Sequence, residues 1–194
     1  MRRVNEIFYS LQGEGMHTGE AAVFIRFCGC NLKCPFCDTD FSQGEEMSDE
    51  EILSEVNKYP SRLVVLTGGE PTLSVDRAFV QLLKDNGRYV AMETNGTHQA
   101  PENLDWVTVS PKFEYVGEKG KLVEQRIDEL KVVYSLGTDV SRYTGIPAKH
   151  YLLQPCDTGD KKKNEEIIVH CVAYILGHPA WKLSLQTQKI LNVR

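Results

Sequence analysis

The stretch AAVFIRFCGCNLKCPFCDTD, residues 21–40, decides how the rest of the sequence is interpreted. Its first seven residues, 21–27, form an apolar run with the length and composition of a buried strand. The glycine, proline and cysteines that follow are incompatible with a continued strand, so residues 28–40 are predicted to form a loop. Three thiols therefore lie on a loop directly after a strand, at CxxxCxxC spacing.

These thiols, Cys30, Cys34 and Cys37, are spaced so that their sulfurs can converge on three corners of a cubane iron-sulfur cluster. Electron-transfer clusters are usually closed by four cysteines. A cluster with three protein ligands keeps one iron open, and an open iron can bind a cofactor or substrate much as a catalytic zinc ion does. We therefore predict a 4Fe-4S cluster with one iron available for chemistry.

A zinc site is the alternative interpretation of the same cysteines. Structural zinc prefers four ligands in paired CxxC-type knuckles, and a second knuckle is missing, although a distant His17 or His98 would complete a site. Cys28 falls outside the spacing and is interpreted as a packing residue. Cys156 and Cys171 are interpreted by default as small buried hydrophobic residues.

Predicted strands and helices alternate along the rest of the chain. Helices are predicted to start at Ser48, which can form a capping box with Glu51, at Ser74 and at Asn164. The basic run 161–163 is interpreted as a solvated loop that leads into the third helix. Further strands are predicted at residues 62–67, 88–93, 106–109, 129–134, 149–153 and 182–185.

This alternation favours parallel βαβ units. A complete eight-unit barrel usually needs about 250 residues, and this chain has 194. We therefore predict an α/β fold with a single domain over residues 1–194: a shortened, partial (β/α) TIM-like barrel of about six parallel strands. The C-terminal ends of such strands form one functional face. Polar motifs follow the predicted strands at residues 68–71, 93–96, 110–112, 154–157 and 186–187.

Composition and charge favour a small-molecule substrate. The chain has 41% hydrophobic and 25% charged residues, and no apolar run approaches the about 20 residues that cross a bilayer. No signal peptide is evident. The formal charge of -5 disfavours a nucleic-acid partner, because such proteins cluster lysine and arginine. Six cysteines without a secretory signal indicate a reducing, cytoplasmic location.

The motifs resemble the radical S-adenosylmethionine (SAM) superfamily in CxxxCxxC, Gly68-Gly69-Glu70-Pro71 and Ser110-Pro111-Lys112. Features along nearly the whole chain are similar to the 7-carboxy-7-deazaguanine synthase family, namely LQGEG at 11–15, CDT at 37–39, QPCD at 154–157 and SLQT at 184–187.

The resemblance implies a radical SAM lyase of queuosine and 7-deazaguanine biosynthesis. Its substrate would be 6-carboxy-5,6,7,8-tetrahydropterin, and its products 7-carboxy-7-deazaguanine and ammonia. A 5'-deoxyadenosyl radical would abstract the hydrogen at C6. Because the cofactor supplies this radical, no protein residue is assigned as catalytic.

The resemblance also implies a role for individual residues. Cys30, Cys34 and Cys37 would hold the cluster, and Thr39 would bind Mg2+. Residues implied to contact SAM are Phe36, Cys37, Asp38, Gly69, Glu70, Ser110, Pro111, Lys112, Gln154, Pro155, Cys156 and Asp157. Residues implied to contact substrate are Leu11, Gln12, Gly13, Arg26 and Thr67.

Simpler interpretations stand beside several of these roles. The Arg26 guanidinium offers a bidentate fork for a carboxylate, but it is also compatible with an ion pair. Glu70 can accept from the cofactor ammonium or compensate the charge of a helix N-terminus. Leu11 to Gly13 can be a glycine-rich turn, and Thr39 a turn residue.

The family further implies a homodimer and an electron donor such as a flavodoxin. The sequence departs from many relatives at Gln188, where they have histidine. Two other functions remain open: an activase that installs a glycyl radical on a partner protein, and a zinc or iron-sulfur module without catalysis.

Overall fold

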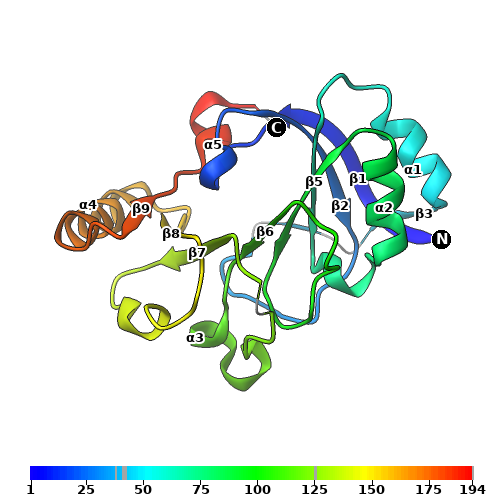
Figure 1. Cartoon of the computed structure of the whole chain (residues 1–194). Coiled ribbons are helices and arrows are strands. Elements are labelled where there is room, and N and C mark those ends of the chain that lie inside the picture. The colour runs from blue at the N-terminus through cyan, green and yellow to red at the C-terminus, as the bar shows by residue number, and fades with distance from the viewer. Residues whose placement is uncertain (38, 41–42, 125, 194) are drawn as a thin grey trace.

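The computed structural model describes residues 1–37, 39–40, 43–124 and 126–193. Its framework is a nine-stranded sheet with the order β3-β1-β2-β4-β5-β6-β7-β8-β9 (Figure 1). The strands are β1 Arg2–Leu11, β2 Ala21–Phe27, β3 Glu45–Met47, β4 Leu63–Gly68, β5 Tyr89–Thr94, β6 Trp106–Val109, β7 Glu129–Tyr134, β8 His150–Pro155 and β9 Trp181–Leu183. The α-helices are α1 Asp49–Val56, α2 Arg77–Asp85, α3 Phe113–Val116, α4 Lys161–Gly177 and α5 Thr187–Leu191. The 3-10 helices are η1 Gly15–His17, η2 Pro71–Leu73, η3 Gly117–Gly120 and η4 Val140–Tyr143.

The seven strands from β2 to β9, β3 excepted, pair in parallel, which confirms the predicted partial barrel. The sheet also contains two strands that the sequence did not predict. β1 pairs antiparallel with β2, and β3 pairs antiparallel with β1. Within the described residues β3 and β9 are the two edges of the sheet, so the barrel stays open on one side.

Helix starts follow local capping. Ser48 and Glu51 form the predicted capping box at α1. The prediction of Ser74 as the second cap is wrong, because Ser74 follows η2 as its C-terminal cap residue and the Asp76 side chain accepts from the Phe79 amide instead.

The start of α4 also differs from the prediction. Asp160 caps this helix by accepting from the amides of Lys162 and Lys163, so the basic run is its first turn and not a loop. Asn164 lies inside this turn. Its side-chain oxygen accepts from the Thr158 amide, and its side-chain nitrogen donates to the Asp157 carboxylate.

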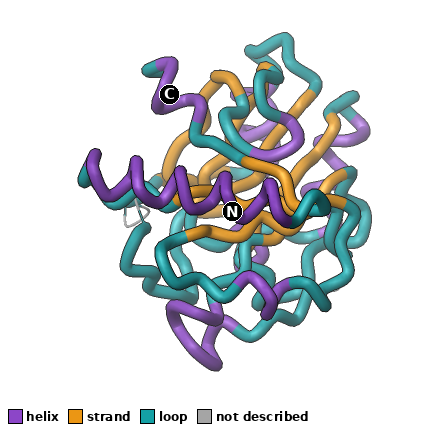
Figure 2. Tube along the Cα trace, turned by 90° about the vertical axis from the view of Figure 1, so that its left-hand side faces the viewer, coloured by secondary structure: helices purple, strands orange, loops and turns teal. Residues whose placement is uncertain are grey.

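The two faces of the sheet have different surroundings. In β2, Val23, Ile25 and Phe27 pack into the main core with buried residues of α1, α2 and α4. Figure 2 shows α4 lying across the strands at one end of the sheet. On the other face, Ala22 and Phe24 belong to a smaller apolar cluster near the start of the strands. Among the described residues, none of the helices combines the length and the hydropathy that a membrane span requires.

Candidate functional site

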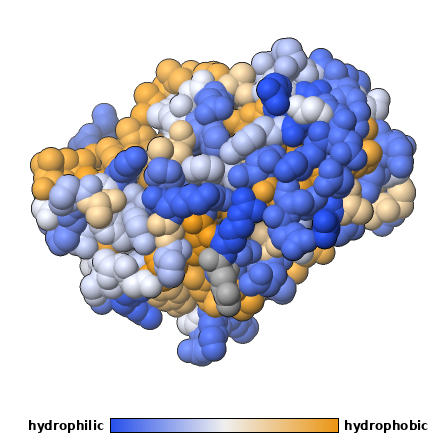
Figure 3. Space-filling model, viewed as in Figure 1, coloured by the Kyte–Doolittle hydropathy of each residue, from blue (hydrophilic) through white to orange (hydrophobic). Residues whose placement is uncertain are grey.

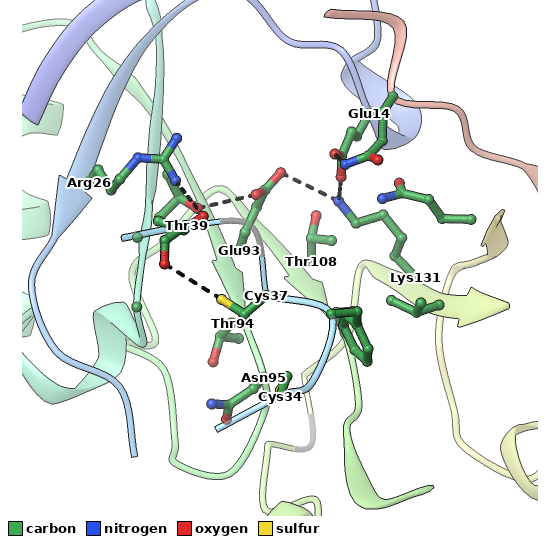
Figure 4. Close-up of a pocket in the computed structure, with 18 of the residues that line it drawn as sticks. Glu14, Arg26, Cys34, Cys37, Thr39, Glu93, Thr94, Asn95, Thr108 and Lys131 are labelled. Carbon is green, nitrogen blue, oxygen red and sulfur yellow. Dashed lines mark hydrogen bonds and ion pairs between the residues drawn. The ribbon is translucent and has the colours of Figure 1, made fainter. Parts of the chain in front are cut away.

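A cavity of about 640 Å³ lies at the C-terminal half of the inner sheet face (Figure 4). Its lining comes from β1, β2 and β4 to β8, from the loop after β2 that carries the three cysteines (the cysteine loop) and from the residues that begin at Gln186 (the C-terminal segment). The small apolar cluster, in which the rings of Phe8 and Phe24 stack at 4.9 Å, closes the cavity toward the strand starts. The predicted gathering of the strand-end motifs is therefore present.

All three predicted cluster cysteines line this cavity and carry free thiols. The Cys37 amide donates to the Cys34 carbonyl at 3.3 Å, and the Leu32 amide donates to the Cys30 sulfur at 3.4 Å. Leu32 itself is buried, so it anchors the loop between the first two cysteines.

The cysteine loop begins in close contact with the end of β4. The Gly69 amide donates to the Phe27 carbonyl at 3.0 Å, and the Glu70 amide donates to the Gly29 carbonyl at 2.9 Å. A Cβ atom at Gly69 would lie 1.8 Å from the Gly29 carbonyl oxygen, one residue before Cys30. Glycine is therefore required at this position.

The chemistry of the three thiols fits an iron-sulfur cluster. Burial is the main reason why the pKa of Cys30 and of Cys34 is raised, and the Cys37 thiol raises both further. Lys112 acts in the opposite direction and favours the thiolates that metal binding needs.

The zinc interpretation needs ligands that meet at one ion. Across the described ranges, no group of three or more Cys, His, Asp or Glu side chains that could hold one metal ion is present. A cubane cluster offers each sulfur its own iron, so its cysteines need not meet at a single ion. His17, one proposed fourth zinc ligand, packs against Tyr89 and Trp106, the first residues of β5 and β6.

The residues implied to contact SAM divide into two groups. Those that line the cavity are Phe36, Cys37, Gly69, Ser110, Lys112, Gln154, Cys156 and Asp157. Pro111, Pro155 and Glu70 are not part of its lining, and Asp38 lies outside the described residues. The Lys112 ammonium donates to the Ser110 carbonyl at 2.7 Å and lies 5.9 Å from the Phe36 ring centre. Its burial lowers the pKa of Lys112 to about 8.

Glu70 has a structural role in this arrangement. Its side chain is fully buried and accepts from the hydroxyls of Thr72 and Thr94, each at 2.6 Å, and from the Asn95 amide at 2.7 Å. It also caps η2 through the Thr72 amide. These bonds tie the end of β5 to η2, and they fit the interpretation of Glu70 as a residue that compensates a helix end.

The predicted substrate residues all line the cavity: Leu11, Gln12, Gly13, Arg26 and Thr67. Arg26 donates through Nε to Glu6 at 2.9 Å and through a terminal nitrogen to the Thr39 hydroxyl at 3.3 Å. Gln12 donates to Glu93 at 3.0 Å and accepts from the Glu14 amide at 3.1 Å. Both ends of the Gln12 amide are thus held by the protein.

Sequence reasoning assigned no role to three further cavity residues, Glu14, Thr108 and Lys131, and it placed Glu93 in the polar motif 93–96 of the functional face (Figure 4). Lys131 forms ion pairs with Glu14 at 2.6 Å and with Glu93 at 3.6 Å. Burial alone would raise the pKa of Glu14, but the Lys131 ammonium outweighs it and lowers that pKa to about 2. The available signal was a lysine inside the apolar strand 129–134.

The C-terminal segment covers the open side of the barrel. Thr187 donates through its amide and its hydroxyl to the Gly13 carbonyl, at 3.0 and 2.8 Å. Gln186 and Gln188 donate to one oxygen of Glu14 at 3.0 and 3.2 Å. Figure 1 shows the result, with α5 beside the loop that follows β1.

A second contact joins this segment to the QPCD motif. Lys189 forms an ion pair with Asp157 at 2.9 Å, and this hydrogen bond is the main reason why the pKa of Asp157 falls to about 2. Gln188, Lys189 and Asp157 all line the cavity. The segment that departs from the family pattern at Gln188 is therefore part of the site.

Comparisons with known proteins agree with this site. The family model described as "Radical SAM superfamily" matches residues 24–151. A 7-carboxy-7-deazaguanine synthase from Bacteroides thetaiotaomicron is 54% identical over 194 residues, which cover all of both chains. One from Bradyrhizobium diazoefficiens is 39% identical, with 98% of each chain covered. The crystal structure of QueE from Escherichia coli superimposes with a TM-score of 0.74 and 30% identity, covering 95% of this chain and 93% of that chain.

Proposed function

The chain belongs to the radical SAM superfamily and, within it, to the 7-carboxy-7-deazaguanine synthase family, and we propose that it converts 6-carboxy-5,6,7,8-tetrahydropterin to 7-carboxy-7-deazaguanine. It is a radical SAM lyase with a 4Fe-4S cluster and SAM as cofactors and a small-molecule substrate. The substrate contains the same atoms as the product and ammonia together, so the reaction needs no external oxidant. The observation that carries the proposal is full-length similarity together with three thiols on the described cavity.

The residues that would hold the cofactors lie on the cysteine side of the cavity. Cys30, Cys34 and Cys37 would ligate the cluster, and the lining residues around Gly69 and Lys112 would bind SAM. When bound, these cofactors supply the radical that removes the hydrogen at C6 of the pterin. The protein contributes position and the exclusion of water.

The part of the cavity beside Arg26 and Thr39 would receive the substrate. Arg26 offers a guanidinium for the pterin carboxylate, and its cavity position and existing bond to Thr39 support this role. The Thr39 hydroxyl is a suitable ligand for Mg2+, which commonly takes few protein oxygens and binds substrate oxygens as well. A carboxylate between Arg26 and a Thr39-bound Mg2+ would be held next to the cysteine loop, to which Thr39 belongs.

The partners also belong to this proposal. One-electron reduction of the cluster needs a donor, for which a flavodoxin is suitable. A homodimer is supported by exposed apolar side chains that gather over α4 and the C-terminal segment (Figure 3). They are Ile168, Val169, Leu176, Leu183, Ile190, Leu191 and Val193. Six free cysteines suit a reducing cytoplasm.

Anaerobic turnover tests the proposed reaction. Reconstituted protein with reductant, Mg2+ and SAM should form 7-carboxy-7-deazaguanine and ammonia from the tetrahydropterin. A matched Cys34→Ala variant, given the same iron and sulfide, should form neither. No deazaguanine from fully reconstituted protein would refute the reaction, and a glycyl radical on a partner protein would point to an activase instead. One zinc per chain without acid-labile sulfide would indicate a non-catalytic module.

A further inference from the structure

Lys131 occupies the middle of the inner sheet face, and nothing in the cofactor or carboxylate-binding roles uses it. Its side chain is only 7% exposed, yet it lines the cavity. Its ammonium lies 2.6 Å from Glu14 Oε2 and 3.6 Å from Glu93 Oε1 (Figure 4). Glu14 comes from the loop after β1 and Glu93 from β5, so a single cation joins two separate walls.

The energetics explain why a lysine is tolerated at this depth. Burial alone would lower the pKa of Lys131, but the charges of Glu14, Glu93 and Glu129 outweigh burial and raise it, so the ammonium stays protonated. Two carboxylates that project into one cavity repel each other unless a cation lies between them. Lys131 supplies that cation.

The neutral partners of the two carboxylates cannot replace this charge. Gln186 and Gln188 donate to the remaining oxygen of Glu14. Gln12 and Thr67 donate to Glu93, at 3.0 and 3.3 Å. These bonds fix where each carboxylate lies, but amides and hydroxyls leave both negative charges uncompensated once the ammonium is removed.

We propose that Lys131 is a positioning residue that holds Glu14 and Glu93 side by side and aimed into the cavity, and that it acts on substrate affinity through them. The identity of that substrate rests on the proposed function. The charged groups that face this arrangement are Glu14, Glu93, Glu129 and, from the loop after β6, Lys112. Lys131 is distant in sequence from Cys30, Cys34 and Cys37. Its ion pairs are with Glu14 and Glu93 and not with a cluster cysteine.

The decisive variant is Lys131→Met, which keeps the length of the side chain and removes its charge. We expect the KM for the tetrahydropterin to rise about tenfold to a hundredfold, as for the loss of a charged hydrogen bond. Formation of 5'-deoxyadenosine without substrate should stay within about twofold of the wild type, because the ion pairs of Lys131 are with Glu14 and Glu93 and not with the residues implied to contact SAM. Lys131→Arg should recover part of the affinity. Lys58→Met, which breaks an exposed pair with Glu55, is the matched control.

A second readout needs neither cofactor nor substrate. In protein with carbon-13 at the glutamate carboxyls, the Glu14 signal of the wild type should titrate near its low pKa of about 2. In K131M burial becomes the largest influence, so the Glu14 carboxyl should titrate above its ordinary pKa, and its charge should be lost as the pH falls through that higher value. The acid limb of kcat/KM should move upward with it.

Either of two results overturns the proposal: an unchanged Glu14 titration in K131M, or equal losses of substrate affinity and of uncoupled SAM cleavage. If K131M does not fold, the variant that combines Lys131→Met with Glu14→Gln and Glu93→Gln carries the test. Its KM should match that of the variant with the two glutamate changes alone, and a further tenfold rise would show that Lys131 acts directly and not through the two carboxylates. An inactive wild type with the expected titration shift would refute the proposed reaction and leave the charge coupling intact.

Discussion

Replacement of Gly69 by alanine should detach the cysteine loop from the end of β4. The added Cβ would lie 1.8 Å from the Gly29 carbonyl oxygen and 2.4 Å from its carbon. Both are backbone atoms, so no side-chain rotation can relieve the clash. Gly69 does not have a left-handed φ, and the expected effect is therefore purely steric.

The size of the displacement follows from these distances. An ordinary contact of about 3.4 Å requires the two segments to separate by about 1.6 Å. The two hydrogen bonds between them, now 3.0 and 2.9 Å, would then exceed hydrogen-bonding distance. Overpacking and the two lost bonds together should cost about 2 to 4 kcal/mol.

Function should suffer more than stability, because Cys30 directly follows the displaced Gly29. A misplacement of about 1 Å at a reacting centre can lower the rate about a hundredfold. We expect G69A to bind less than the full complement of iron and sulfide after anaerobic reconstitution. Deazaguanine formation should fall at least about a hundredfold.

Gly145→Ala is the matched control, since its Cβ would meet no atom within 4 Å and its φ is not left-handed. It should keep wild-type iron content, melting temperature and turnover. Iron and sulfide analysis, a thermal melt and the turnover assay on both variants measure the three quantities. Full cluster content and turnover within about twofold of the wild type in G69A would refute the steric argument.

Three other perturbations test separate parts of the molecule. Arg26→Ala should raise the KM for the tetrahydropterin about tenfold or more while 5'-deoxyadenosine formation without substrate is kept; equal loss of both contradicts the carboxylate role. Thr39→Val should raise the Mg2+ concentration needed for half-maximal turnover and leave uncoupled SAM cleavage unchanged, and an unaltered Mg2+ dependence speaks against it. Asp76→Ala should lower the free energy of unfolding by about 1 kcal/mol in urea at neutral pH. Its bond from the Phe79 amide lowers the pKa of Asp76, so this contribution exists above the ordinary carboxyl pKa and disappears as the pH falls through the lowered value; a difference that persists in acid contradicts the cap.

The parallel strands were predictable because each is an apolar run bounded by turn residues. Residues 21–27, 106–109 and 129–134 were predicted with the bounds that the structure has. β1 was missed because it begins with two arginines and carries Asn5 and Glu6, and only Val4 and Phe8 are buried. Its stability comes from pairing with β2, which is not encoded in its own composition.

Helix starts were less predictable, since Ser, Asp and Asn are nearly equivalent caps. Asp76 was preferred over Ser74 because tertiary contacts settle the choice. Arg2 of β1 forms ion pairs with Asp49 in α1 and with Asp76 at the start of α2. One cation from the N-terminal strand thus fixes two helix starts that are distant in sequence.

The spacing of the cysteines predicted that they belong to the site, but no spacing predicted that the charges of Lys131, Glu14 and Glu93 lie together in the cavity. A single lysine in an apolar strand faces solvent as readily as it faces a cavity, and only the curvature of the sheet decides which. In β2 the inner face changes from Ala22 and Phe24 to Arg26, whereas the outer face stays apolar throughout. The inner face of β2 therefore changes along the strand from a buried apolar surface to a charged surface that lines the cavity.

The open side of the barrel explains why the C-terminal segment belongs to the site. A closed barrel excludes water through its own strands, but here the sheet ends at β9 within the described chain. Residues 186–188 bind Gly13 and Glu14 instead, and so place polar side chains where further strands would stand. Glu14 is bound both by this segment and by Lys131, so closure of the barrel and the charge balance of the cavity depend on the same carboxylate. The LQGEG loop is thus a structural junction as well as a binding segment.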